Sequence, residues 1–289
     1  MRRCVTCEAT IDGAGWECRR CLFKPAIVNG VPVLAPELAH GNPIDADYDY
    51  GVLRAADEGH FWFTHRNRLI AWAIRRYFPD ARSFIDVGCG TGGVLRALRS
   101  TIPSVQYAGA DALLAGLALA RQTVPDVPFA QVDIHHLPYD REFDLIGAFD
   151  VVEHLDDDEH ALRELYRSTR PGGGLIVTVP QHPFLWSALD EFSRHRRRYS
   201  RRRLMEVVRG AGYTVERATS FMAFVLPLMI VSRLRKRDLD ALDVGAEMRL
   251  PPVVNRILDA VCAVESAAIV AGMSFPAGGS LLLVARRES

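Results

Sequence analysis

The sequence of 289 residues lacks a long hydrophobic run, an excess of charge of either sign, and any internal repeat. Its longest uncharged apolar stretch, residues 221–231, is too short to cross a bilayer. Lys and Arg together number 35, as do Asp and Glu, which argues against a protein built mainly to coat nucleic acid. Cysteines stand at the N-terminus where a signal peptide would have an apolar segment, so we expect a cytoplasmic protein.

Cysteine is also scarce, but four of the six cysteines lie near the N-terminus in the spacing C-x2-C-x10-C-x2-C. These four are Cys4, Cys7, Cys18 and Cys21. Two C-x2-C turns can present four thiolates to one tetrahedral ion, and a closed site of this kind is structural. Two disulfides are the alternative, which a cytoplasmic location disfavours. The spacing therefore predicts a zinc-ribbon-like module in residues 1–40.

Residues 41–82 are expected to form a helical connector ahead of the first core strand. Within it, residues 58–78 place aromatic and aliphatic side chains at helical spacing, with arginines between them. Phe61 and Trp62 either pack this helix against the sheet or belong to a lid that contacts a substrate.

From residue 83 onward, predicted strands and helices alternate, as in a doubly wound α/β fold. We expect a seven-stranded, mostly parallel sheet whose last strand is a hairpin-like edge strand. Strands are predicted at 83–87, 105–110, 128–132, 143–149, 174–180, 213–220 and 280–286. Helices are predicted near 92–100, 112–122, 157–169, 201–211 and 251–271. Residues 83–289 then form one domain with insertions at 181–204 and 221–272.

The segment FIDVGCGTGGVLRAL, residues 84–98, runs from an apolar strand through a glycine turn into a helix. A dinucleotide fingerprint is one interpretation of its glycines. Asp86, however, stands directly before the turn, where it would crowd a pyrophosphate but suit the ammonium group of S-adenosylmethionine (SAM).

Three glycines, Gly88, Gly90 and Gly92, allow the backbone to approach such a ligand, and the following helix N-terminus offers amides to its carboxylate. Asp111, at the end of the second predicted strand, is placed to accept both ribose hydroxyls. That acid is shared by NAD and SAM folds and does not discriminate between them.

Residues 130–157, AQVDIHHLPYDREFDLIGAFDVVEHLDD, resemble the class I SAM-dependent methyltransferases, especially those acting on small molecules. The resemblance implies that Asp133 accepts a hydrogen bond from the adenine amino group and that Ile134 stacks on the ring. It also implies that the loop beginning at Asp150 lies beside the methyl group. RPGGGLIVTVP, residues 170–180, matches the family's turn into the fifth strand.

The loop QHPFLWSALDEFSRHRRRYSRRRL, residues 181–204, resembles a methyltransferase subgroup with a similar pattern of Pro, Leu-Trp-Ser, Asp, His and Arg-Tyr. His182, Trp186 and Tyr199 are therefore candidates to line an acceptor pocket. The alternative for the two aromatic residues is that they only pack the loop.

Methyl transfer requires acceptor, methyl and sulfur in line, and a hydroxyl acceptor must also lose its proton. His154 and His195 are the candidate bases, with Glu153 or Asp190 as orienting carboxylates. An amine or an acidic phenol would not need them.

Seven arginines between residues 194 and 203 could bind phosphates of RNA, a nucleotide-linked intermediate or a lipid headgroup, or could be neutralised by the acids at 156–159. The ribbon followed by NGVPVL (29–34) resembles bacterial rRNA guanine methyltransferases with a zinc ribbon. Against RNA, DVVEH at 150–154 is of the small-molecule type.

We therefore predict methyl transfer to a hydroxyl or amine of a small molecule, such as a natural product, a sugar or a lipid-linked intermediate. A zinc-ribbon rRNA methyltransferase and a SAM-binding protein without turnover are the alternatives. Residues 221–243 join an apolar stretch to a basic one, which is typical of peripheral membrane contact, a dimer contact or a pocket wall. The oligomeric state stays open.

Overall fold

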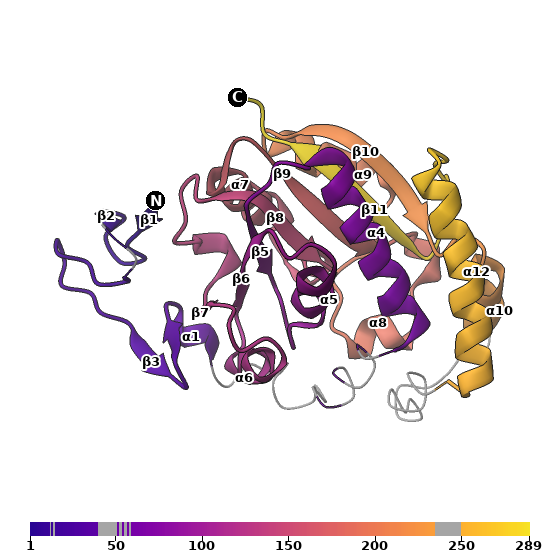
Figure 1. The fold of residues 1–289 in the computed structure, drawn as a ribbon, viewed down its shortest axis with the longest axis horizontal. Helices are drawn as coiled ribbons and strands as arrows, with labels where there is room; N and C mark the ends of the chain where they lie inside the picture. The colour runs from indigo at the N-terminus through magenta and orange to yellow at the C-terminus, as the bar shows by residue number, and fades with distance from the viewer. Residues whose placement is uncertain are drawn as a thin grey trace.

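A nine-stranded sheet runs through the protein, as seen in the computed structural model (Figure 1). The structure describes residues 1–11, 13, 15–39, 51, 54, 57, 59–234 and 250–289. Residues 41–50, 52, 53, 55, 56 and 58 of the predicted connector and the basic end of the predicted 221–243 segment lie outside these residues.

The strand order is β10-β11-β9-β8-β5-β6-β7-β4-β3, and neighbours from β9 to β4 are parallel. The bounds are β3 (Ala26–Val28), β4 (Val31–Val33), β5 (Ser83–Val87), β6 (Gln106–Asp111), β7 (Phe129–Gln131), β8 (Phe143–Phe149), β9 (Thr169–Pro180), β10 (Thr214–Phe221) and β11 (Ser280–Arg286). Seven of these strands correspond to the predicted ones. The doubly wound α/β fold is confirmed.

The last strand is not an edge strand, and that prediction is wrong. β11 lies between β10 and β9 and is antiparallel to both. Residues 280–285 are all buried, so this strand is covered on both faces. An uninterrupted apolar run of this kind suits the interior of a sheet better than its edge.

Helices cover the two faces of the sheet, and alternate residues of each strand point to opposite faces. Phe84 packs with the cluster under α4, α5, α6 and α12, whereas Ile85 packs with the cluster under α7 and α9. The helix bounds are α4 (Phe61–Tyr77), α5 (Gly93–Thr101), α6 (Leu114–Thr123), α7 (Asp158–Ser168), α9 (Arg201–Gly210) and α12 (Pro252–Val270).

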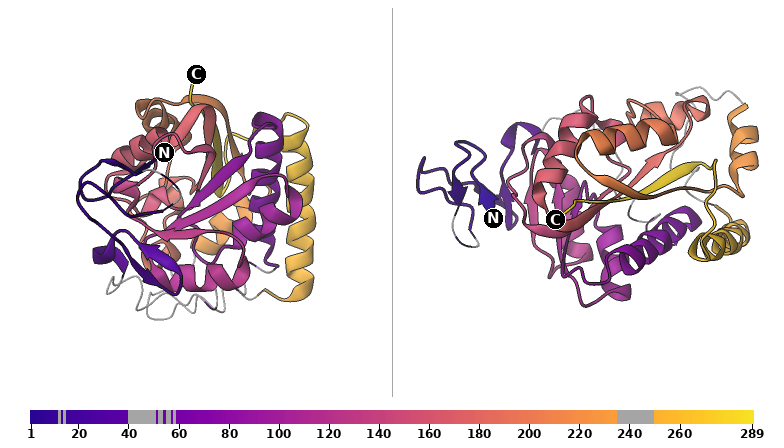
Figure 2. Two further views of the ribbon diagram at one scale, coloured as in Figure 1. Left: turned by 60° about the vertical axis from the view of Figure 1, so that its left-hand side comes forward. Right: turned by 90° about the horizontal axis from the view of Figure 1, so that it is seen from above.

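The N-terminal segment adds two strands to the seven that the sequence predicts. β3 and β4 form a hairpin whose turn residues, Asn29 and Gly30, both have positive φ, as a tight two-residue turn requires. β4 pairs in parallel with β7, and the Gln131 side chain accepts from the Ala35 N–H at 2.9 Å. The short strands β1 (Arg2–Arg3) and β2 (Thr10–Ile11) project beyond this end of the molecule (Figure 2).

The insertion after β10 contains α10 (Leu226–Leu234) and places α12 beside α4 (Figures 1 and 2). A buried network holds them there: His65 of α4 contacts Glu265 at 3.0 Å and Ser266 at 2.8 Å. Glu265 also accepts from the backbone N–H groups of Met222 and Phe224. Among the described helices, none has the length and apolar character needed to span a membrane.

Candidate active site

A cavity of about 890 Å³ opens at the carboxyl ends of β5, β6 and β8. In open α/β sheets, ligands bind at this edge. One part of its wall consists of residues 86–91, 93 and 94 together with Asp111, Asp133 and Ile134, whereas Gly92 is not among the lining residues. The other part comes from the segment after β8 and from the two insertions. A single cavity is therefore lined both by residues predicted to bind the cofactor and by the two histidines predicted as bases.

Gly88 is the most constrained residue of the glycine turn after β5, and a side chain does not fit there. Gly88 has φ +79°, and a Cβ there would lie 2.3 Å from a methyl carbon of Val151. Gly90 and Gly92 also have positive φ, and Gly92 caps the N-terminus of α5. The backbone is thus exposed to the cavity at a helix N-terminus, which suits an anionic group.

Asp86 is fully buried in the cavity wall, and its Oδ1 has no hydrogen-bond partner in the structure. Burial raises the pKa of this carboxyl to about 7, although the nearby Arg66 guanidinium pulls it down. A buried acid with an unpartnered oxygen is stabilised by a cation that enters the cavity.

Asp111 and Asp133 both line the cavity and both order the loops that follow them. Asp111 accepts from the backbone N–H groups of Gly90 at 2.8 Å and Leu113 at 2.9 Å. Asp133 accepts from the His135 N–H at 2.9 Å and contacts the His136 ring. Burial alone would raise the pKa of Asp133, but the hydrogen bonds from His136 and His135 lower it.

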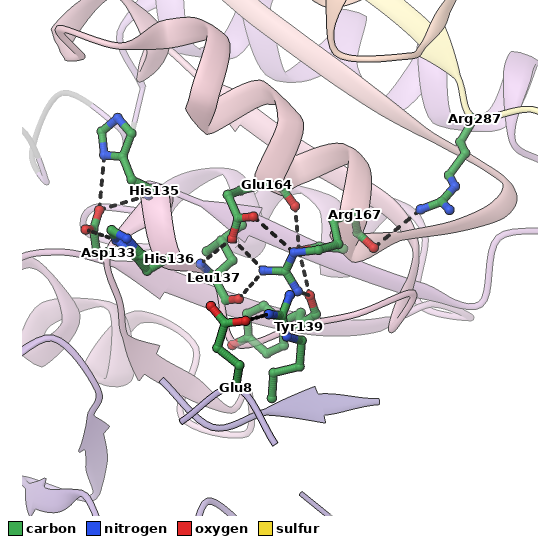
Figure 3. A network of polar contacts seen from close by, with 11 residues as sticks. Glu8, Asp133, His135, His136, Leu137, Tyr139, Glu164, Arg167 and Arg287 are labelled. Carbon is green, nitrogen blue, oxygen red and sulfur yellow. Dashed lines mark hydrogen bonds and ion pairs between the residues drawn. The ribbon is translucent and has the colours of Figure 1, made fainter. Parts of the chain in front are cut away.

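The short 3-10 helix η1 (Ile134–His136) and the chain after it are fastened to α7 (Figure 3). Arg167 donates to the carbonyl oxygens of Leu137 and Tyr139 at 2.5 and 2.6 Å. Glu164 accepts from the Leu137 N–H at 3.0 Å. This network fixes the position of Ile134 in the cavity wall.

Asp150 is held by a buried arginine that comes from α4. Arg66 donates to Asp150 Oδ2 at 2.7 Å, and the Thr178 hydroxyl donates to the same oxygen at 3.1 Å. The Arg66 guanidinium also lies 4.8 Å from the Trp62 ring centroid. Phe61 and Trp62 pack against the core and also line the cavity, while contact of either residue with a substrate stays a prediction.

A second polar cluster, Glu153, His154 and His195, lines the same cavity. The imidazole centroids of His154 and His195 are 4.8 Å apart. His195 Nδ1 lies 2.8 Å from Asp190 Oδ1, and its Nε2 lies 3.9 Å from Glu153 Oε1. The two candidate bases, His154 and His195, therefore lie in one cluster with the carboxyl groups of Glu153 and Asp190.

Asp190 is itself locked in place. It accepts from Arg198 at 2.7 Å and from the backbone and hydroxyl of Ser187 at 2.8 and 3.0 Å. Although burial would raise the pKa of Asp190, the hydrogen bonds from His195 and Arg198 lower it to about 2. As a carboxylate, Asp190 accepts a hydrogen bond from His195 Nδ1, and this bond orients Nε2 into the cluster.

Burial also shapes the other two members of the cluster. It lowers the pKa of His154 to about 4, with a smaller contribution from His195, so this imidazole is neutral near pH 7. Glu153 is completely buried, which raises the pKa of its carboxyl, and neither of its oxygens has a hydrogen-bond partner in the structure.

Three predicted acceptor residues do not line the cavity. The Tyr199 side chain is buried away from it, and its hydroxyl donates to Asp158 at 2.6 Å. Trp186 is partly exposed and donates to Glu191, while the His182 ring packs on Phe184. The interpretation of Trp186 and Tyr199 as loop-packing residues fits this placement.

The arginine run at 194–203 is largely paired within the chain. Arg196 contacts Asp156, Arg197 contacts Asp158, and Arg203 contacts Glu159. Arg198 is held by Asp190 as described, and Arg202 pairs with Glu206. The acids at 156–159 therefore neutralise much of this run, which argues against a surface that binds phosphates.

The four N-terminal cysteines converge on one point. Cys4 Sγ lies 3.5 Å from Cys21 Sγ, and Cys7 Sγ lies 3.6 Å from Cys18 Sγ. All four sulfurs lie within 4.8 Å of one another. Four thiolates bound at about 2.3 Å to one tetrahedral ion have a similar separation, so the donor set fits Zn²⁺.

Apolar residues of the insertion after β10 also line the cavity. Val225, Leu228 and Met229 come from the segment around α10, and Leu258 comes from α12. The apolar run at 221–231 was the available signal, and a pocket wall was one of its open interpretations.

The model of a methyltransferase domain matches residues 60–218 of the chain. A trans-aconitate 2-methyltransferase of Azoarcus sp. is 35% identical over 103 residues, which are 36% of this chain and 41% of that protein. A malonyl-(acyl-carrier protein) O-methyltransferase of Enterobacter lignolyticus is 32% identical over 133 residues, 44% of this chain and 52% of that one. The chain thus matches about half, or less, of the length of these curated relatives.

A solved structure described as a complex of the Haloferax volcanii Trm112 methyltransferase activator with a putative methyltransferase matches with a TM-score of 0.55. Identity is 21%, and the match covers 85% of this chain and 98% of that chain. It supports the fold alone. The family-model match includes the glycine turn, Asp111, Asp133 and the segment after β8, and on that match the chain belongs to the methyltransferase domain family of class I SAM-dependent methyltransferases.

Proposed function

We propose that this protein transfers the methyl group of SAM to a hydroxyl group of a small molecule with an apolar body. One observation carries the proposal: a single cavity meets the cofactor motifs at one end and Glu153, His154 and His195 at the other. Its volume falls in the range of small-molecule sites.

At the cofactor end, Asp86 would face the methionine ammonium, Asp111 the ribose hydroxyls and Asp133 the adenine amino group. The backbone at Gly88, Gly90 and Gly92 would approach the methionine carboxylate. Asp150, paired with Arg66, would position the loop beside the methyl group.

At the acceptor end, the hydroxyl oxygen attacks the methyl carbon while the bond from carbon to sulfur breaks, and the electron pair stays on sulfur. The hydroxyl proton must leave, and His195 is the stronger candidate to take it, because Asp190 orients its ring. His154 would line the same pocket as a neutral imidazole.

The apolar wall of Val225, Leu228, Met229 and Leu258 supports an acceptor with an apolar body. Two relatives carry the names of small acceptors, trans-aconitate and a malonyl group on acyl-carrier protein, which favours a small molecule over RNA. The paired arginines at 194–203 weigh in the same direction.

A methyl-release assay with phenols, sugars, lipid-linked alcohols, amines and ribosomal RNA tests this proposal. We expect release with hydroxyl-bearing amphiphiles and a lower rate of release with Asp111→Ala at SAM concentrations near the wild-type Kd. Release only with ribosomal RNA would favour the zinc-ribbon rRNA alternative. SAM binding without release from any acceptor would favour the non-catalytic one.

We also propose that the cysteine cluster binds one structural Zn²⁺, since its four sulfurs already surround one point. Metal analysis of protein purified without chelator should find the ion. A Cys4→Ser, Cys7→Ser variant should lose it. A protein with no zinc and four free thiols would contradict the site.

A lipid surface is the partner that we propose for the segment from residue 221. Phe224, Leu228 and Val231 are exposed on or beside α10, and Val253 and Ile257 are exposed on α12 next to it. Leu228 is 59% exposed and also lines the cavity, so an amphiphilic acceptor could pass from membrane to site. Vesicle flotation that is unchanged by Leu228→Asp with Val231→Asp would remove this idea.

A further inference from the structure

The cluster of Glu153, His154 and His195 has the composition and geometry of a metal site. A carboxylate oxygen and one nitrogen from each imidazole lie within 4.8 Å of one another. Ligand atoms that share one ion at about 2.1 Å lie up to about 4.2 Å apart. Small side-chain movements would therefore bring the three groups into one coordination shell.

An unpartnered carboxylate supports the presence of a cation. Glu153 is 0% exposed, and neither of its oxygens accepts a hydrogen bond in the structure. A buried carboxylate without a partner is costly, so the group keeps its proton unless a cation replaces it, and a coordinated metal ion is such a cation. Glu153 lines the cavity beside both imidazoles, so a cation at this point meets all three groups.

The residues behind His195 match the outer shell of a metal ligand. Asp190 accepts from His195 Nδ1 at 2.8 Å and turns Nε2 toward Glu153. Arg198 and Ser187 in turn hold Asp190. A histidine ligand commonly donates its second ring N–H to a carboxylate in this way.

We propose that Glu153, His154 and His195 bind a divalent first-row transition-metal ion that holds the acceptor oxygen during methyl transfer. Two imidazoles favour such a cation over Mg²⁺ or Ca²⁺, which prefer oxygen ligands. Three protein ligands leave coordination positions open toward the cavity, as in catalytic metal sites.

The chemistry rests on the proposed methyl transfer. The acceptor hydroxyl coordinates the ion, and its proton passes to water. The resulting oxyanion attacks the methyl carbon as the bond from carbon to sulfur breaks, which yields the methyl ether and S-adenosylhomocysteine. In this arrangement His195 binds the metal ion and does not act as the base. Measuring metal uptake therefore distinguishes the ligand role of His195 from the base role.

Titration of the metal-free full chain with Co²⁺, without SAM or acceptor, tests the site. The cysteine cluster should give thiolate-to-cobalt charge-transfer absorption. The second site, with only nitrogen and oxygen ligands, should add weaker visible bands without it. We expect two equivalents in the wild type and loss of only the second in Glu153→Gln and His195→Ala.

Asp190→Asn should weaken the second equivalent by about 10- to 100-fold, because Asp190 acts through His195. His160→Ala is the matched control, since it removes a histidine that does not line the cavity, and it should bind both equivalents. Retained SAM binding shows that each variant is folded.

Uptake of a single equivalent with thiolate absorption by the wild type would overturn the proposal, as would normal uptake by Glu153→Gln. Full methyl release after removal of the second ion alone would do the same. A second equivalent in a protein that releases no methyl group from any acceptor would support the metal site and refute the proposed function.

Discussion

The two ends of the cavity obtain their polar groups from different parts of the chain. At the cofactor end, Asp86, Asp111 and the glycine turn stand at or directly after strand ends, and Asp111 accepts from the backbone of Gly90 and Leu113. At the acceptor end, Glu153, His195 and Leu228 come from three segments far apart in the sequence. The first end is specified by local sequence and the second by how insertions fold onto the sheet.

The largest effect on turnover is expected from a substitution at the acceptor end. It distinguishes the two ends most clearly because SAM binding should not change. His195→Ala removes the imidazole that Asp190 orients, and loss of a general base costs about 10²- to 10⁴-fold in rate. A metal-ligand role also predicts a large loss. Turnover on the true acceptor should fall while the SAM Kd, measured by calorimetry, stays unchanged. Near-normal turnover in both His195→Ala and His154→Ala would mean that positioning alone drives catalysis.

Asp111→Ala should produce the reverse pattern. Removing hydrogen bonds to a charged group costs about 1–3 kcal/mol, and the loop from Gly90 to Leu113 also loses its acceptor. The SAM Kd should rise accordingly, with the acceptor KM unchanged at saturating SAM. An unchanged SAM Kd in the folded variant would contradict the placement of the ribose.

The cofactor end should also respond to pH through Asp86. Burial raises the pKa of this carboxyl to about 7, so the free protein carries a proton there at lower pH. The SAM ammonium binds the ionised form, and binding below pH 7 must therefore release that proton. SAM affinity should fall toward acid pH, by up to about tenfold per pH unit.

Asp86→Asn is the control for that effect, because it cannot ionise. Its SAM affinity should be low and nearly independent of pH between 5.5 and 7.5. A wild-type Kd that is constant over this interval would show that Asp86 does not face the ammonium.

The smallest effect is expected from the N-terminal cluster. The Cys4→Ser, Cys7→Ser variant should lose zinc, while its SAM Kd should stay within experimental error, because the four cysteines do not line the cavity. Leu38, which does line it, follows the β3–β4 hairpin rather than the cysteine turns. A large loss of SAM affinity would indicate that the ribbon supports the cofactor end through that hairpin.

Most of the fold could be predicted because strand and helix periodicity is a local property. The alternation from β5 to β9 follows from apolar runs and glycine turns, and every predicted strand there is present. The position of β11 could not be predicted in the same way. A run that is apolar at every position indicates burial on both faces, but not which two strands will flank it.

The candidate site likewise contains residues that local sequence could identify and residues whose placement depends on packing. The glycine turn, Asp111 and Asp133 could be identified because cofactor binding depends on backbone geometry at strand ends. Tyr199 and Trp186 were chosen from a pattern within one loop, and their direction depends on packing against α7 and within the loop itself. The ion pair of Arg66 could not be predicted, because its partner Asp150 is distant in the sequence.

The sequence by itself determined the α/β class, the methyltransferase resemblance and the spacing of the four cysteines, because each depends on residues close together in the chain. Only the tertiary structure placed Glu153 without a partner beside two imidazoles and closed the acceptor end with α10 and α12. Those contacts join distant segments, and their geometry is decided by packing of the whole fold rather than by local pattern.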